Sequence, residues 1–230
     1  MSFRIFPGDR LLLAFVAAVV VFLAVSPLFL SDAAFQRTYA EGGIVETISF
    51  YGWLAGAVMI FIRVRPVGYR AVSFAILSLA LAAREADWQK KFTSEGVLKI
   101  NYYENASYPL AERLIAGIIV LILAAGLIYA FYAAIRFLFF ENGWSARSGV
   151  WLFITGVCLV LGKSLDRLPA ELNNLFGITV GEGWVIHFQA LEEGIETLAP
   201  LVFLWSVWVS GIGRSYLARK EKQNPSESLT

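Results

Sequence analysis

Three glutamates within five residues of one apolar segment carry the clearest chemistry in this sequence. Glu192 and Glu196 are four residues apart, and Glu193 and Glu196 are three apart, so on a helix these carboxylates share a face. Clustered carboxylates are typical of a general acid/base, a proton carrier or a divalent-cation site. We therefore take Glu192, Glu193 and Glu196 as the candidate catalytic residues, and as the ligands of any metal ion.

Charged residues on other apolar segments are the candidates for binding a ligand. Arg84, Lys163 and Arg167 have the charge and the donors to bind a phosphate or a carboxylate group. Acidic residues lie beside these bases and near the outer ends of neighbouring segments. The full candidate set for ligand binding is Arg84, Glu85, Asp87, Glu46, Glu112, Lys163, Asp166, Arg167 and His187.

The same residue types limit the cofactors. A carboxylate cluster without imidazole suits a hard cation such as Mg²⁺ or Ca²⁺. The chain has one histidine, His187, and one cysteine, Cys158, so we expect neither haem nor zinc.

Composition places these charges in a membrane protein. The chain of 230 residues is 58% hydrophobic and 16% charged, whereas soluble domains are about half apolar and a quarter charged. This balance predicts an all-α fold, a polytopic membrane helix bundle whose main partner is the lipid bilayer. It also argues against nucleic acid as a partner.

About 20 apolar residues are needed to cross a bilayer as a helix. The sequence predicts six such helices, over residues 11–30, 44–62, 71–88, 112–135, 149–167 and 184–213. We expect the first to be an uncleaved anchor, since its apolar run is too long for a typical signal peptide. Residues 1–220 then form a single transmembrane domain, and residues 221–230 form a polar tail that we expect to be disordered.

Positive charge predicts the orientation of the bundle. With the N-terminus in the cytoplasm, 11 of the 19 Lys and Arg residues but only 4 of the 18 acids lie on the inner side. This asymmetry follows the positive-inside rule, so we expect both termini in the cytoplasm.

Depth in the bilayer is what brings the candidate residues together. From their cytoplasmic ends, the third and fifth segments have only 13 and 14 uncharged residues before the first charge, which is about 20 Å of helix. Charges at this depth cost free energy unless they face the bundle interior and pair with one another. We therefore expect a polar cavity in the outer half. The alternative is a set of salt bridges that only lock the helix ends together.

Two outer loops, residues 89–110 and 168–183, complete the predicted outer surface. Residues 97–103 are aromatic and β-like, and residues 168–177 predict a short helical turn.

Three stretches carry a resemblance to other proteins: READWQKKFTSEGVLKINYYENASYPLAERLIAG (84–117), KSLDRLP (163–169) and EEGIETLAP (192–200). In their order they resemble a group of small bacterial multi-pass inner-membrane proteins. The resemblance implies a multi-pass protein of the bacterial inner membrane and a single site formed by the three motifs. It implies no activity.

These features favour an integral inner-membrane protein with a buried, carboxylate-rich site in its outer, periplasmic half. Its most concrete form is a membrane-embedded enzyme, or a binding protein, for a lipid or a small periplasmic ligand. One alternative is an ion- or proton-coupled transporter, although the inner halves of the segments offer no visible polar path. Another is a non-catalytic assembly protein whose outer loops bind a partner.

Overall fold

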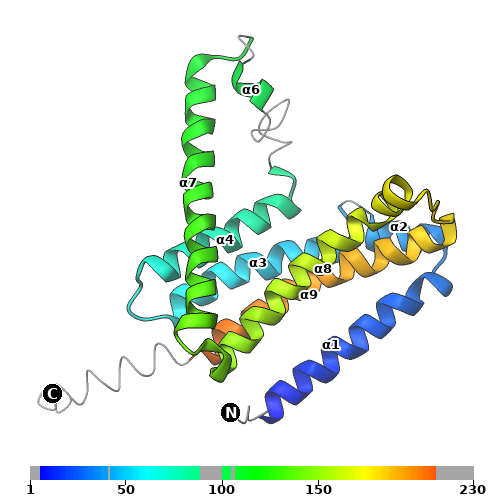
Figure 1. Ribbon diagram of the computed structural model, residues 1–230, viewed down its shortest axis with the longest axis horizontal. Helices are drawn as coiled ribbons and strands as arrows, with labels where there is room; N and C mark the ends of the chain where they lie inside the picture. The colour runs from blue at the N-terminus through cyan, green and yellow to red at the C-terminus, as the bar shows by residue number, and fades with distance from the viewer. Residues whose placement is uncertain (1–5, 41, 89–99, 105–106, 211–230) are drawn as a thin grey trace, which may run out of the picture.

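The described part of the chain is built from helices. The computed structural model describes residues 6–40, 42–88, 100–104 and 107–210, and these contain no strand (Figure 1). The predicted all-α class is confirmed. The predicted polar tail, residues 221–230, and most of the first outer loop, residues 89–99, lie outside the described residues.

Each of the six predicted segments contains a long helix. These are α1 (Pro7–Val25), α3 (Ile44–Arg63), α4 (Tyr69–Glu85), α7 (Leu110–Ile135), α8 (Arg147–Phe176) and α9 (Glu182–Val209). Within the described residues, four helical segments are long and apolar enough to cross a membrane: Pro7–Leu28, Asp32–Arg63, Leu110–Phe140 and Arg147–Phe176. The apolar helices thus fit an integral membrane protein. Six crossings and cytoplasmic termini stay predictions, since α4 has only 17 residues and α9 carries the glutamate cluster.

Shorter elements connect the long helices. They are the 3₁₀ turn η1 (Ser26–Leu28), α2 (Asp32–Tyr39), α6 (Ile100–Glu104), the π-helical turn η2 (Arg136–Phe140) and the 3₁₀ turn η3 (Gly143–Ser145). Ser31 caps α2 by accepting a hydrogen bond from the backbone N–H of Ala34. The β-like prediction for residues 97–103 is wrong for residues 100–103, which belong to α6; residues 97–99 lie outside the described residues.

Helix α8 continues nine residues beyond its predicted end at Arg167, to Phe176. It passes through Pro169 and ends at Gly177, whose φ of +67° is left-handed and suits glycine. The backbone N–H groups of Gly177 and Ile178 donate to the carbonyls of Asn173 and Leu172 and so close the helix end. The turn predicted over residues 168–177 is therefore part of one long helix.

Helices α8 and α9 pack side by side, α3 packs against both α4 and α9, and α1 packs against α9 (Figure 1). Small residues allow these close approaches. A Cβ at Gly52 of α3 would lie 2.9 Å from the Pro200 side chain, and a Cβ at Gly194 of α9 would lie 2.2 Å from Leu23 of α1. The absence of a side chain at Gly194 therefore allows α1 to pack closely against α9.

Helix α7 packs mainly against α4 and diverges from the other helices toward its N-terminal end (Figure 1). The two helices touch at Gly126, where a Cβ would lie 2.6 Å from the Ile76 side chain. Toward the N-terminal end, α7 exposes Leu114, Ile118 and Leu121. This divergence leaves the adjoining face of α8 without cover from α7.

A buried carboxylate joins the N-terminal ends of α1 and α8 to the C-terminal part of α9. Asp9 has no exposed surface. Arg147 donates to its two oxygens from Nε and Nη2 at 2.9 and 2.8 Å, and the indole N–H groups of Trp151 and Trp205 donate at 2.9 and 3.0 Å. The backbone N–H of Phe6 adds a fifth bond at 3.2 Å. We call these residues the Asp9 cluster.

A second, exposed ion-pair group lies at the start of α4. Arg70 donates to Glu141 at 2.6 Å, and Arg136 approaches the same carboxylate at 2.9 Å. The hydrogen bond from Arg70 holds the pKa of the Glu141 carboxyl below its usual range. This group ties α4 to the turn that follows α7.

Candidate functional site

An ion pair between α4 and α9 lies at the centre of the predicted site. Arg84 Nη2 donates to Glu196 Oε2. The Glu196 side chain is 8% exposed, whereas that of Arg84 is 44% exposed. Arg84 can therefore offer its remaining N–H groups outward while it neutralises a buried carboxylate.

The other oxygen of Glu196 is buried and has no hydrogen-bond partner in the described part of the chain. Glu196 fits here because its neighbour on α8 is Gly162. A Cβ at Gly162 would lie 2.5 Å from Glu196 Cγ and 3.3 Å from Oε1. The absence of a side chain at Gly162 thus creates the space for the glutamate, and the unpartnered oxygen lies on the α8 side.

Further carboxylates surround this ion pair on two sides. Glu85 interacts electrostatically with Arg84, Glu196 and Glu46. Glu193 interacts with Glu192, Glu196, Glu46 and Glu85. Acids from α3, α4 and α9 therefore lie close together. Proximity of these acids is expected from their predicted depth in the bilayer.

On its other side, Glu192 faces α8, where it interacts electrostatically with Asp166 and Lys163. Lys163 and Asp166 form an ion pair three residues apart on α8, with both side chains exposed. We call the linked set the outer charged site; its members are Glu46, Arg84, Glu85, Lys163, Asp166, Glu192, Glu193 and Glu196.

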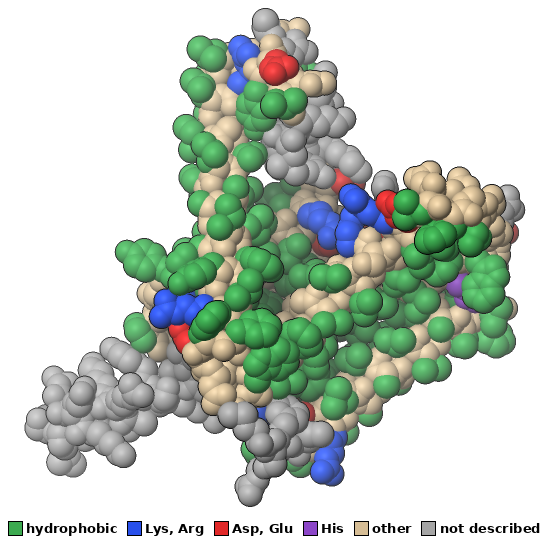
Figure 2. All heavy atoms as spheres, in the orientation of Figure 1, with side chains coloured by type: hydrophobic (Ala, Val, Ile, Leu, Met, Phe, Trp, Pro, Cys, Tyr) green, Lys and Arg blue, Asp and Glu red, His purple; other side chains and the backbone are tan. Residues whose placement is uncertain are grey.

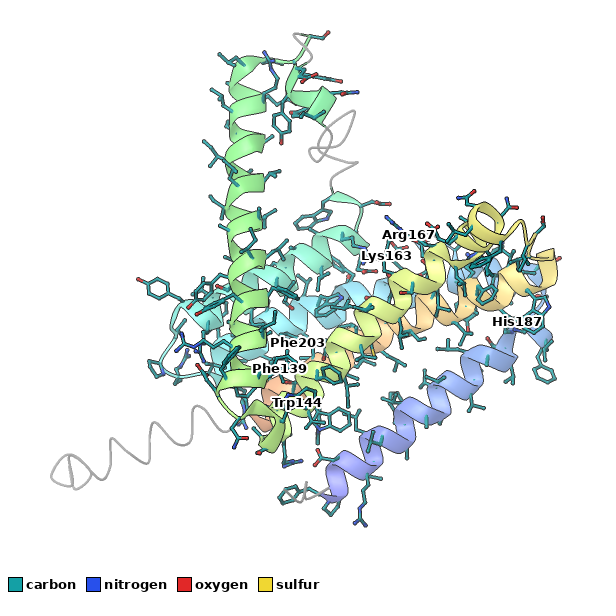
Figure 3. The ribbon with its side chains drawn as sticks, in the orientation of Figure 1. Phe139, Trp144, Lys163, Arg167, His187 and Phe203 are labelled. Atoms are coloured by element: carbon teal, nitrogen blue, oxygen red, sulfur yellow. The ribbon has the colours of Figure 1, made fainter. Side chains whose placement is uncertain are left out.

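A shallow, open groove lies along one face of α8 beside this site, and all of its lining residues belong to α8. Its lining residues are Leu159, Val160, Lys163, Ser164, Arg167, Leu168 and Glu171. Figure 3 shows Lys163 and Arg167 on the same side of α8, away from α1. In Figure 2, basic and acidic side chains gather where the outer parts of α4 and α8 approach one another, with apolar side chains beyond them.

Two predicted residues lie away from this site. His187 sits on the opposite side of the α8–α9 pair (Figure 3), where its Nδ1 is 3.0 Å from the carbonyl of Ala24 on α1. Glu112, at the start of α7, accepts a hydrogen bond of 2.8 Å from the Tyr102 hydroxyl. Burial, and then this hydrogen bond, raise the pKa of Tyr102 to about 12, so that it stays a phenol and a donor.

Asp87 lies just beyond α4, with a left-handed φ of +50°. Arg167 is exposed in the groove, and no described acid forms an ion pair with it. It is therefore the base of the groove whose donors are most available to a ligand.

The described residues include no group of three or more His, Cys, Asp or Glu side chains placed to hold a metal ion. The three glutamates of α9 thus lie in one neighbourhood without converging on a single point. Their arrangement gives no support for a Mg²⁺ or Ca²⁺ ion.

Sequence reasoning missed two features of this architecture, the Asp9 cluster and the role of Gly162. An acid in the first turn of an apolar helix was the available signal for the first, because a charge there needs a partner. No sequence signal pairs Gly162 with Glu196.

In comparisons with known proteins, no family model, no curated protein and no solved structure matches the chain.

Proposed function

We propose that this is a bacterial inner-membrane protein that binds a phospholipid through its phosphate, in the outer half of the bilayer. The observation that carries the proposal is the position of Lys163 and Arg167, one helical turn apart on an open groove of α8. Two cations four residues apart on a helix present their donors to the same small anion.

The groove has the polarity of a phospholipid. Leu159 and Val160 line it on the turn before Lys163, and Leu168 and Glu171 line it beyond Arg167. In the predicted orientation its apolar end therefore lies toward the bilayer centre and its charged residues lie toward the outer surface. Lys163 is separated from the start of α8 by about four turns of helix, which is a rise of roughly 24 Å. This depth suits a headgroup phosphate in the outer leaflet of a bilayer with a core about 30 Å thick.

A catalytic form of this proposal adds Glu192, Glu193 and Glu196 as acid/base residues acting on the bound lipid. The binding form needs only the cations and the groove, and it is the form that the geometry supports best. The alternative of a protein partner at the outer loops draws on residues 89–99, outside the described part of the chain.

The transporter alternative has little support from the inner half. A cavity of about 120 Å³ there has mostly apolar walls, including Ile60, Phe74 and Phe203, with Arg70 and three serines among its other lining residues. Of its hydroxyl groups, Ser206 donates to the carbonyl of Ser148, and Ser210 donates to that of Val207. In the described residues, these walls offer an ion no continuous polar path to the outer charged site.

Lipid binding to the double variant Lys163→Gln/Arg167→Gln tests the proposal. Loss of two charge-assisted hydrogen bonds, at about 1.5–3 kcal/mol each, should weaken phospholipid binding at least about tenfold. Native mass spectrometry of the detergent-purified protein with added phosphatidylglycerol would measure the bound fraction. Arg10→Gln is the matched control, because Arg10 is an exposed base at the opposite end of the bundle.

Equal binding by the wild type and the double variant would contradict the proposal, and so would a wild type that binds no phospholipid. Equal losses in the double variant and in Arg10→Gln would show a general effect of positive charge and would also count against a site on α8.

A further inference from the structure

The outer charged site contains more acid than its bases can neutralise. Among the described residues, the site has two bases, Arg84 and Lys163, and six carboxylates: Glu46, Glu85, Asp166, Glu192, Glu193 and Glu196. If all are ionised, these residues carry four excess negative charges, and charge is costly within a bilayer. A cation from outside the chain would reduce the repulsion among these carboxylates.

The unpartnered oxygen of Glu196 shows where an additional donor is missing. Glu196 is only 6% exposed, and its Oε1 atom has no hydrogen-bond partner in the described residues. A buried acceptor without a donor costs about 1–3 kcal/mol. This oxygen lies against Gly162, the residue before Lys163, so the missing donor belongs next to the phosphate-binding end of the groove.

Glu192 lies on the same side. It is half-buried, four residues before Glu196, and it interacts electrostatically with Lys163 and Asp166 on α8. The carboxylates of Glu192 and Glu196 on α9 therefore lie next to the turn of α8 that carries Lys163, at the edge of the groove and not among its lining residues.

The chemistry of the missing cation follows from the spread of these acids. A divalent metal ion requires several oxygens converging at about 2.0–2.6 Å, and no group of three described acids meets that condition. A primary ammonium has three N–H donors that point in different directions. It can therefore bind to carboxylates that do not converge on one point.

Resting on the proposed function, we propose that the bound lipid is zwitterionic, with a primary ammonium that binds to Glu192 and to the free oxygen of Glu196 while Lys163 and Arg167 bind its phosphate. Phosphatidylethanolamine has this headgroup. Phosphatidylglycerol has the phosphate without the ammonium, and phosphatidylcholine has a quaternary ammonium with no N–H donor. Comparing these three lipids with identical acyl chains therefore distinguishes binding of the phosphate from binding of the ammonium.

Native mass spectrometry of the full chain with an equimolar mixture of these three lipids tests the proposal. We expect the wild type to bind phosphatidylethanolamine about tenfold more than either other lipid, the ratio that one charge-assisted hydrogen bond supports. Glu192→Gln should reduce this preference to about twofold or less, because the amide has half the accepting capacity and no charge. Binding of phosphatidylglycerol by the same variant should be retained, which shows that the fold and the phosphate half are intact.

Glu104→Gln is the matched control, since Glu104 is an exposed acid on α6 outside the outer charged site, and it should keep the wild-type preference. Equal binding of phosphatidylethanolamine and phosphatidylglycerol by the wild type would overturn the inference and leave the proposed function standing if Lys163 and Arg167 were still required. An unchanged preference in Glu192→Gln would also overturn it. A wild type that binds none of the three lipids would refute both proposals.

Discussion

Replacing Asp9 with alanine should destabilise the protein by about 3–5 kcal/mol, the cost of breaking a buried ion pair by removing one partner. Asp9 has no exposed surface. Its removal leaves the guanidinium of Arg147 and the indole N–H groups of Trp151 and Trp205 without their acceptor. Because these donors belong to α8 and α9, the change weakens the contacts among three helices at once.

Denaturation in mixed micelles, followed by tryptophan fluorescence, measures this loss. Asp32→Ala is the matched control, because Asp32 also lies in the first turn of a helix but is exposed; its effect should stay within about 0.5–1 kcal/mol. A double-mutant cycle with Arg147→Ala should show that the two losses are far from additive. Similar stability of Asp9→Ala and Asp32→Ala would mean that the Asp9 cluster contributes little to folding.

The long helices could be predicted from sequence for a simple physical reason. A run of about 20 apolar residues in a bilayer must satisfy its own backbone hydrogen bonds, and a helix does so within the segment. The ends of helices are less constrained. Pro169 indicates a break by its missing N–H, yet α8 continues to Phe176 because its real end depends on the left-handed turn at Gly177.

The contents of the outer charged site could also be predicted, but its pairings could not. The depth of the charges predicts that Arg84, Lys163 and Glu196 lie near one another; in the structure Arg84 pairs with Glu196, and Lys163 interacts with Glu192 one turn earlier on α9. The choice of the acid that pairs with Arg84 depends on the register of α4 against α9, and this register depends on packing over many residues. The same limit applies to Glu112, because nothing in its sequence shows that α7 diverges from α8 (Figure 1).

The hydrogen bonds of the Asp9 cluster could not be predicted from sequence either. Asp9 can be counted from sequence as an acid on the inner side, and Trp151 and Trp205 as parts of apolar runs. Their hydrogen bonds join residues 142 and 196 positions apart. Contacts between residues so far apart in sequence are set by tertiary packing, so the sequence pattern of each helix does not predict them.

Removing Arg84 should be the second most damaging change, because it leaves the buried Glu196 carboxylate without its cation. We expect Arg84→Gln to destabilise the protein by on the order of 2 kcal/mol. This loss is below the 3–5 kcal/mol for a fully buried pair, since the Arg84 side chain is 44% exposed and solvent weakens its interaction. The same denaturation measurement applies, and Asp166→Asn is the matched control because it removes a member of an exposed pair.

A second substitution separates charge from shape. If the loss in Arg84→Gln comes from an unpaired carboxylate, adding Glu196→Gln should recover much of it, since the amide keeps the volume beside Gly162 and carries no charge. If the loss comes instead from the packing of the Arg84 stem, the double variant should be no more stable than the single one. The first result would make the Arg84–Glu196 pair the electrostatic bond between α4 and α9. It would also show that the carboxylate itself is a burden on stability, as expected of a group retained for binding a ligand.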